Sequence, residues 1–288
     1  MQGMKNSGAI RDWHSFWRFP IVWLIVGALG IVLADAVFRP LAERAEGMVS
    51  LIWTLIDGLV VVLIYKLTIR YLARRSVPEL AKHRAGIETV MGMLIGTIFI
   101  VVSTFIIVAM GGYSLQWVTN VDTNAALISS IGAALGGAIV EELIFRGLLF
   151  QALHRWGGDW LALAVTSLFF GVAHLGNPGA TLWSGFAIAV EAGVLLGAAY
   201  MWRRNLWFTI GLHFAWNALE SLLGILVSGH AAAGLFTVKM KGAALLTGGN
   251  FGLEGSIVPV LISLLISVPM LIGVARNRDG HLSISRLE

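Results

Sequence analysis

Two adjacent glutamates and an arginine, Glu141, Glu142 and Arg146, lie inside an apolar stretch that begins near Ala125. A charged side chain at the centre of a bilayer costs roughly 2.5–3.5 kcal/mol on insertion scales, so an ionisable residue there usually has a function. On a helix, Glu142 and Arg146 are four residues apart and can neutralise each other, whereas Glu141 points about 100° away. A structural ion pair would account for Glu142 and Arg146, but the unpaired Glu141 favours a functional site.

Three further polar residues, His174, His213 and Asn217, occur at related positions. A helix that contains Glu141 can continue to the Gly-Gly-Asp turn at 157–159, and His174 lies as far after this turn as Glu141 lies before it. An antiparallel hairpin would therefore place Glu141 and His174 at one depth. His213 and Asn217 are four residues apart and share one helical face. A lone histidine could simply join two helices by a hydrogen bond, but so many polar groups on three helices would be costly as structure alone.

These residue types suit the hydrolysis of an amide bond. The reaction needs an activated water, donors for the oxyanion and a proton for the leaving amine. A glutamate in low-dielectric surroundings becomes a better base at neutral pH, so Glu141 with His174 could deprotonate the water. His213 and Asn217 could both donate toward one oxygen, as an oxyanion hole requires. Arg146 would hold Glu142 in its charged form.

The same residues leave the role of a metal open. Glu141, His174 and His213 have the donor types of a hydrolytic zinc site. No His-Glu-x-x-His motif occurs, however, and Asn217 is a poor zinc ligand. The sequence therefore requires no cofactor, and it leaves a divalent metal such as Zn²⁺ and a metal-free mechanism as equal alternatives.

The composition indicates the environment of these residues. Of 288 residues, 57% are hydrophobic and only 12% are charged, against about 25% charged in a typical soluble domain. Apolar stretches of about 20 residues recur. We therefore predict an all-α polytopic transmembrane helical bundle. Its expected partner is the lipid bilayer, and no binding of nucleic acid is expected. The chain has no cysteine, which excludes disulfides and thiolate chemistry.

About eight spans are predicted. They cover residues 21–37, 48–69 and 89–110, a fourth span from about 125, and then 161–175, 181–201, 206–227 and 257–275. Cytoplasmic loops carry an excess of Lys and Arg. The side that holds both ends of the chain receives 14 of these residues and the other side receives 4. We therefore expect both termini to be cytoplasmic, in a multi-pass protein of the cell (inner, cytoplasmic) membrane.

We divide the sequence into four regions and predict no separate soluble domain. They are an interfacial segment 1–20 with Trp13, Phe16, Trp17 and Arg18, spans 21–124 with a basic loop 70–88, the core 125–227, and a Gly-rich outer loop, last span and tail in 228–288. Ala34-Asp35-Ala36 imitates a signal-peptidase site, but an uncleaved first span is favoured. The glycines of 247–255 predict a re-entrant or surface turn. Asp57 and Glu191 could each line the cavity or serve as interhelical hydrogen-bond partners, and the second interpretation is favoured.

Three motifs, Glu141-Glu142-x3-Arg146, Phe170-x3-His174 and His213-x3-Asn217, resemble those of the Abi family of intramembrane proteases. This family is also called the CAAX-protease and bacteriocin-processing (CPBP) family and includes the type II CAAX prenyl endopeptidases. The resemblance covers about residues 125–220. It implies an eight-span helical core with a water-accessible cavity and peptide hydrolysis without an acyl-enzyme. The implied catalytic residues are Glu141, His174, His213 and Asn217, with Glu142, Arg146 and Phe170 in support.

The resemblance implies a peptide or membrane-protein substrate, with or without a prenyl group, and does not identify it. Other membrane proteases are disfavoured, because the chain lacks the Gly-x-Ser-Gly of rhomboids and the Gly-x-Gly-Asp of aspartyl proteases. A non-catalytic peptide-binding or bacteriocin-immunity protein of the same fold remains the alternative. A proton-coupled transporter using Asp57, Glu191 and Glu141 is the third interpretation.

Overall fold

The computed structural model describes residues 19–119, 122–231 and 234–284, with side chains up to residue 277. The proposed interfacial segment with Trp13, Phe16, Trp17 and Arg18 lies outside the described residues, so this prediction stays untested. The α-helices are α2 Pro20–Arg44, α3 Gly47–Leu67, α4 Ala85–Ala109, α5 Thr123–Glu142, α6 Phe150–Ala173, α7 Leu182–Ile188, α8 Leu195–Arg203, α9 Leu206–Leu222, α10 Ala244–Thr247 and α11 Ile257–Ile284.

Three π-helical segments interrupt or extend these helices: η1 Thr68–Leu72, η4 Leu143–Leu149 and η6 Ala189–Val194. Short 3₁₀ turns occupy η2 Pro78–Leu80, η3 Lys82–Arg84, η5 His174–Gly176, η7 Gly249–Phe251 and η8 Leu253–Gly255. The predicted all-α bundle is confirmed, with one small addition. Strands β1 Tyr113–Trp117 and β2 Phe236–Met240 form an antiparallel pair between two connections that lie far apart in the chain.

Six helices in the described part of the chain are long and apolar enough to cross a membrane. The number differs from eight for two local reasons. Residues Thr123–Gly176 count as one helix of 54 residues, although Gly158 breaks it with φ 75° and ψ −170°. Helix α9 has only 17 residues, which is slightly short for a full span. The protein is a multi-pass membrane protein; the count of eight and the orientation of the termini stay predictions.

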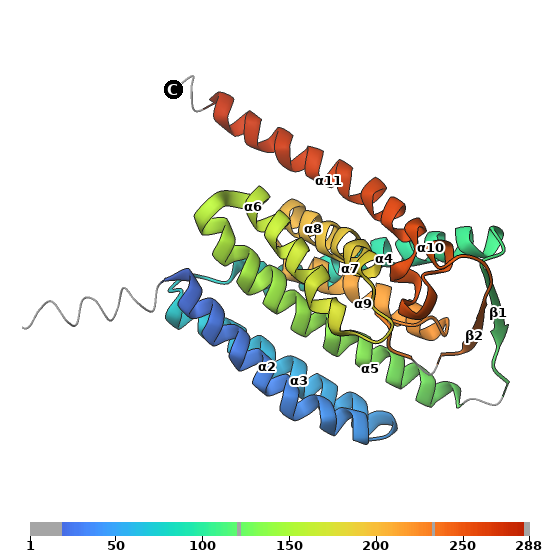
Figure 1. Cartoon of the computed structure of the whole chain (residues 1–288). Helices are drawn as coiled ribbons and strands as arrows, with labels where there is room; N and C mark the ends of the chain where they lie inside the picture. The colour runs from blue at the N-terminus through green and yellow to red at the C-terminus, as the bar shows by residue number, and fades with distance from the viewer. Residues whose placement is uncertain (1–18, 120–121, 232–233, 285–288) are drawn as a thin grey trace, which may run out of the picture.

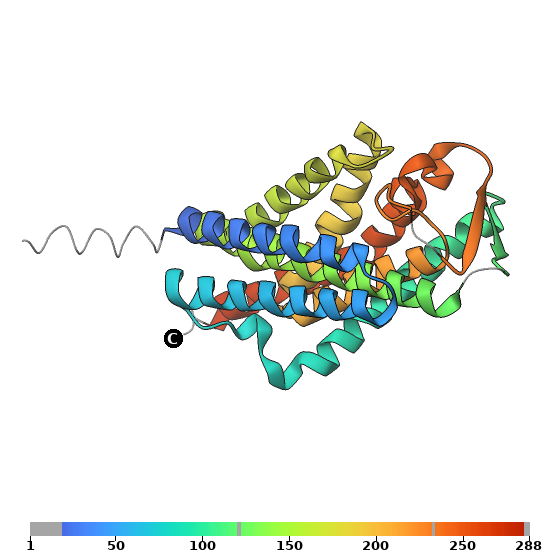
Figure 2. The same cartoon turned by 90° about the horizontal axis from the view of Figure 1, so that it is seen from below.

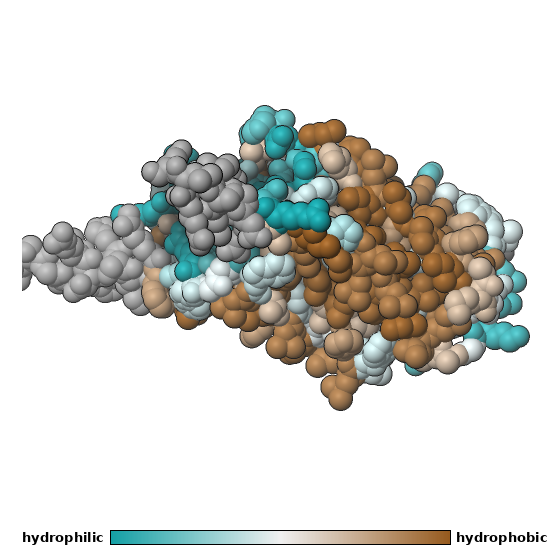
Figure 3. Space-filling view, turned by 90° about the horizontal axis from the view of Figure 1, so that it is seen from above, coloured by the Kyte–Doolittle hydropathy of each residue, from teal (hydrophilic) through white to brown (hydrophobic). Residues whose placement is uncertain are grey.

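The helices are arranged around α5 (Figure 1). The hairpin of α2 and α3 packs along one side of α5, and α11 lies on the far side of the bundle, against α8 and α4. Figure 2 shows α2 and α3 running side by side to their connecting turn. Apolar side chains form a broad band between two more polar ends on the face drawn in Figure 3, as expected for a surface that contacts lipid.

Glycines set the closest helix contacts. A Cβ atom at Gly92 of α4 would lie 2.0 Å from the Phe208 carbonyl oxygen, and one at Gly96 would lie 2.3 Å from that of Leu212. The two glycines therefore let α4 touch the backbone of α9, the helix that carries His213. A looser close approach occurs along Gly132 and Gly136 of α5, where an added Cβ atom would lie 3.4–3.5 Å from the side chain of Thr54 in α3.

The Gly-rich segment 248–255 is buried, not a surface turn. Residues Phe251–Ser256 are all buried, and three of the glycines have positive φ. A Cβ atom at Gly252 would lie 2.0 Å from the carbonyl oxygen of Leu226, and one at Gly248 would lie 1.6 Å from that of Gly252. Only glycine fits such contacts, so this segment folds tightly against the end of α9 and brings Glu254 toward the bundle.

Candidate active site

The first motif sits where α5 changes into the π segment η4. Helix α5 ends at Glu142, and Arg146 follows inside η4, so the expected uninterrupted α-helix is wrong in this turn. The i,i+4 ion pair nevertheless forms: the Nη1 atom of Arg146 donates to Oε1 of Glu142 at 2.8 Å. Wide π turns occur frequently at functional sites, and no periodicity in the apolar residues announces them.

Arg146 also ties the first motif to a second π segment. Its Nη2 atom donates to the carbonyl oxygens of Ala192 at 2.6 Å and Gly193 at 3.3 Å in η6. The guanidinium lies 5.0 Å from the ring centroid of Phe170, within the range of a cation–π contact. Both partners of the ion pair are almost completely buried. Such a charge would be costly unless paired and hydrogen-bonded, and Arg146 meets both conditions.

Glu142 connects this network to the third motif. Oε1 of Glu142 lies 3.1 Å from Nδ1 of His213 in α9, and Nε2 of His213 lies 3.9 Å from Oε2 of Glu141. The two adjacent glutamates therefore contact the same imidazole from its two nitrogens. Glu142 faces the buried arginine, and Glu141 is the less buried of the two.

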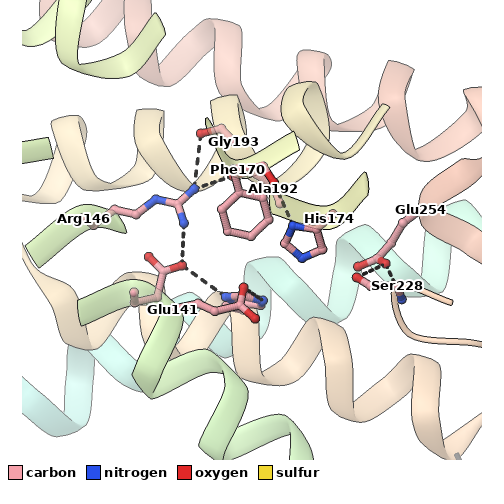
Figure 4. A network of polar contacts seen from close by, with 10 residues as sticks. Glu141, Arg146, Phe170, His174, Ala192, Gly193, Ser228 and Glu254 are labelled. Atoms are coloured by element: carbon pink, nitrogen blue, oxygen red, sulfur yellow. Dashed lines mark hydrogen bonds and ion pairs between the residues drawn. The ribbon is translucent and has the colours of Figure 1, made fainter. Parts of the chain in front are cut away.

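His174 lies at the junction of α6 with the 3₁₀ turn η5. Its Nδ1 atom lies 2.7 Å from the carbonyl oxygen of Phe170, so Nδ1 carries the proton and donates it, which leaves Nε2 as the lone-pair nitrogen. The ring stacks on Phe170 at 4.6 Å between centroids. Phe170 thus orients His174 on one side and receives Arg146 on the other (Figure 4). The four-residue spacing of Phe170 and His174 is what allows this hydrogen bond and this stacking of the two rings.

All four predicted catalytic residues line one cavity of about 620 Å³: Glu141, His174, His213 and Asn217. Phe170 contributes to the same wall, whereas Glu142 and Arg146 lie behind it. Two buried oxygens, Oε2 of Glu141 and Oδ1 of Asn217, have no hydrogen-bond partner among the described residues. Buried polar atoms in proteins are normally satisfied. These two are therefore the atoms that a water or a peptide in the cavity would contact.

Glu254 is a cavity residue that the motifs do not include. Its Oε2 atom accepts hydrogen bonds from the backbone N–H and from the hydroxyl of Ser228, both at 2.6 Å. Figure 4 shows this pair on the far side of His174 from Arg146. Burial raises the pKa of Glu254, and the bonds from Ser228 and the nearby His174 partly offset this effect. The only signal in the sequence was the Gly-rich segment, whose fold could not be read from its composition.

Glu191 does not have the interhelical hydrogen bond expected of it, whereas the carboxyl group of Asp57 in α3 interacts with that of Asp35 in α2. Oδ1 of Asp57 and both carboxylate oxygens of Glu191 lack partners among the described residues. Glu191 is fully buried in η6. Asp57 lines a second cavity, which adjoins the first.

The residues proposed as zinc ligands do not form a three-ligand site. Among the described residues, no three His, Asp or Glu side chains are grouped closely enough to hold a metal ion. A zinc site of the kind that needs three protein ligands therefore does not fit this arrangement of Glu141, His174 and His213.

Comparison with known families matches residues 123–219 to the family model of the Rce1-like type II CAAX prenyl endopeptidases. The matched segment contains the three motifs and extends from α5 through α9. Comparisons with curated proteins and with solved structures find no match. The family match agrees with the arrangement of the motifs around one cavity. In this segment the chain is therefore similar to the CAAX-protease (CPBP) family of intramembrane proteases.

Proposed function

We propose that the chain is an intramembrane endopeptidase that hydrolyses a peptide bond by direct attack of water. The observation that carries this proposal is the arrangement of Glu141, His174, His213 and Asn217 on one cavity. The family match supports a CAAX-type protease in general. The substrate is a peptide or a membrane protein, and a prenyl group on it is compatible with the family.

Glu141 and His174 activate the water in this mechanism. The free Oε2 of Glu141 accepts a proton from the water, while Nε2 of His174 holds the water in place by accepting its second hydrogen. The water oxygen then bonds to the carbonyl carbon and the carbonyl oxygen becomes an oxyanion. When the C–N bond breaks, the proton held by Glu141 passes to the leaving nitrogen. The second proton of the water leaves the new carboxyl group through Nε2 of His174, so the products are a carboxylate, an amine and one released proton.

His213 and Asn217 stabilise the oxyanion. The side-chain amide of Asn217 is a donor on the cavity wall, and its oxygen has no partner among the described residues. A doubly protonated His213 would donate from Nδ1 to Glu142 and from Nε2 toward the cavity, and the two flanking glutamates accommodate this positive ring. One preorganised donor typically contributes roughly 2.7–4 kcal/mol to the transition state.

A comparison of membrane peptidomes tests the proposed activity in cells. Cells that express the wild-type chain are compared with cells that express Glu141→Ala protein at the same level. We expect a set of cleaved peptides that requires the wild-type chain and disappears with Glu141→Ala. Asp122→Asn is the matched control, because Asp122 is an exposed N-cap of α5 and asparagine caps equally well. Identical peptidomes for all three chains would contradict a protease and favour a peptide-binding protein.

A further inference from the structure

A second cavity of about 530 Å³ lies between α2, α3 and α5, next to the active-site cavity. The two cavities share four lining residues, Arg39, Glu43, Ala133 and Gly137. The charge of Arg39 interacts with that of Glu141, which places the shared wall close to the site of hydrolysis. A peptide whose scissile bond lies at Glu141 can therefore extend directly into the second cavity.

The lining of this cavity is acidic. Four carboxylates and one cation face it: Asp35, Glu43, Glu46, Asp57 and Arg39. The Nε atom of Arg39 donates to both oxygens of Asp35 at 3.0–3.1 Å, and Nη2 adds a third bond at 2.9 Å. Because the only lining cation is engaged with Asp35, the other three carboxylates are left without a salt bridge among the described residues.

Asp57 is the most deeply buried of these four carboxylates. Its side chain is only 3% exposed, and its Oδ1 atom has no hydrogen-bond partner among the described residues. A buried carboxylate without a partner is strongly unfavourable, whereas one that meets a positive group is stabilised. The carboxyl group of Asp57 interacts with that of Asp35 on the same cavity, and its Oδ1 atom is left as an acceptor that no described side chain satisfies.

The wall opposite the charged residues is formed by α5 and carries mostly small side chains. Gly132, Ala133, Gly136 and Gly137 all face the cavity. A Cβ atom at Gly137 would meet no atom within 4 Å, so this wall leaves open space beside the helix. There is consequently room for an extended peptide between α5 and the carboxylates of α2 and α3.

We propose that the second cavity is a subsite for a basic side chain, Lys or Arg, of the peptide substrate, with Asp57 as its acceptor. The inference rests on the proposed function, since it names the substrate class of the same enzyme. Continuity with the active-site cavity identifies the occupant as part of the peptide. The absence of a three-ligand metal cluster among the described residues argues against an inorganic cation at this position.

Binding of matched peptides tests the subsite without requiring turnover. Full-length Glu141→Gln protein in lipid nanodiscs is titrated with three fluorescent peptides of one apolar sequence that carry Lys, Gln or Glu at a single position, which is moved along the peptide. We expect the Lys peptide to bind roughly tenfold more tightly than the Gln peptide at one position, a factor that corresponds to about 1.4 kcal/mol. The Glu peptide should bind most weakly.

If the subsite exists as proposed, the tighter binding of the Lys peptide depends on Asp57. In the background Glu141→Gln, adding Asp57→Asn should reduce the Lys-to-Gln ratio to about one, whereas Asp122→Asn should leave it near ten. A thermal melt establishes that each variant is folded. Equal binding of the Lys and Gln peptides at every position, or a preference that survives Asp57→Asn, would overturn the subsite. Neither result would affect the proposed protease activity, which is lost only if no peptide is cleaved by the wild-type chain.

Discussion

At the scale of single residues, the two adjacent glutamates have different surroundings although they are neighbours in sequence. Glu142 is fully buried and bonded to Arg146 and His213, while Glu141 keeps an unpartnered oxygen on the cavity. The first arrangement stabilises the fold and the second is available for chemistry. Replacing Glu142 should therefore reduce mainly the stability of the protein, and replacing Glu141 should reduce mainly its activity.

Replacing Glu142 or Arg146 should destabilise the protein. Removal of one partner of a buried ion pair typically costs 3–5 kcal/mol, because the other charge is left uncompensated. We expect Glu142→Gln and Arg146→Ala to lower the melting temperature and the yield of detergent-extracted protein. Glu141→Gln is the matched control and should melt near the wild type. Unchanged melting temperatures for both buried-pair variants would refute this role.

Replacing Asn217 should slow the reaction without unfolding the protein. As an oxyanion donor, Asn217 contributes only when charge develops on the substrate, so Asn217→Ala should reduce kcat by roughly 10²–10³. KM and the melting temperature should change little. A loss confined to KM would show that Asn217 binds the peptide and does not act on the oxyanion.

The buried carboxyl group of Glu254 should make the stability of the folded chain depend on pH. Burial raises its pKa above the ordinary value of 4.5, so the folded chain holds this proton more tightly than the unfolded chain. The resulting stabilisation is complete below about pH 4.5 and is lost as the pH rises through the raised pKa of the folded state. Melting curves of the wild type across this range should show that loss. Glu254→Gln should flatten the curve, and an equally steep decline in the variant would contradict the assignment.

At the scale of elements, the sequence predicted the hairpin that turns at Gly158 within α6, through the nearly equal distances of Glu141 and His174 from the Gly-Gly-Asp turn at 157–159. Ionisable residues in apolar helices are rare, so their positions carry much information. The π segments η4 and η6 could not be predicted, because nearly all the neighbouring residues are apolar or small, so the shift in phase that an additional residue causes is not visible in the sequence. The pairing of β1 with β2 and the burial of 248–255 depend on contacts between segments far apart in the chain.

The contact between α4 and α9 should be sensitive to the size of one residue. Gly92→Ala would place a Cβ atom against the Phe208 carbonyl oxygen and push away the helix that carries His213. Overpacking typically costs 1–3 kcal/mol, so we expect a lower melting temperature together with reduced activity. Gly86→Ala on the same helix meets nothing within 4 Å and should behave like the wild type. Normal stability of Gly92→Ala would mean that the two helices are farther apart.

At the scale of the whole molecule, the bundle holds two adjoining cavities, and the face drawn in Figure 3 carries a broad band of apolar side chains. Water and a peptide must meet inside this bundle, where low dielectric strengthens every electrostatic interaction with the developing charge. The family match and the arrangement of the motifs both concern residues 123–219. Helices α2 and α3 contribute Asp35, Arg39 and Asp57, which lie outside that segment and line the second cavity.

The central claim is that Glu141 activates water for peptide hydrolysis without a metal ion. The most direct measurement is product formation by purified full-length protein in nanodiscs, followed by mass spectrometry on a peptide found by the peptidome comparison, with a membrane-permeant chelator present. We predict that the wild type continues to form product under chelation and that Glu141→Gln forms none. Activity that disappears with the chelator and returns with added Zn²⁺ would contradict the claim, as would full turnover by Glu141→Gln.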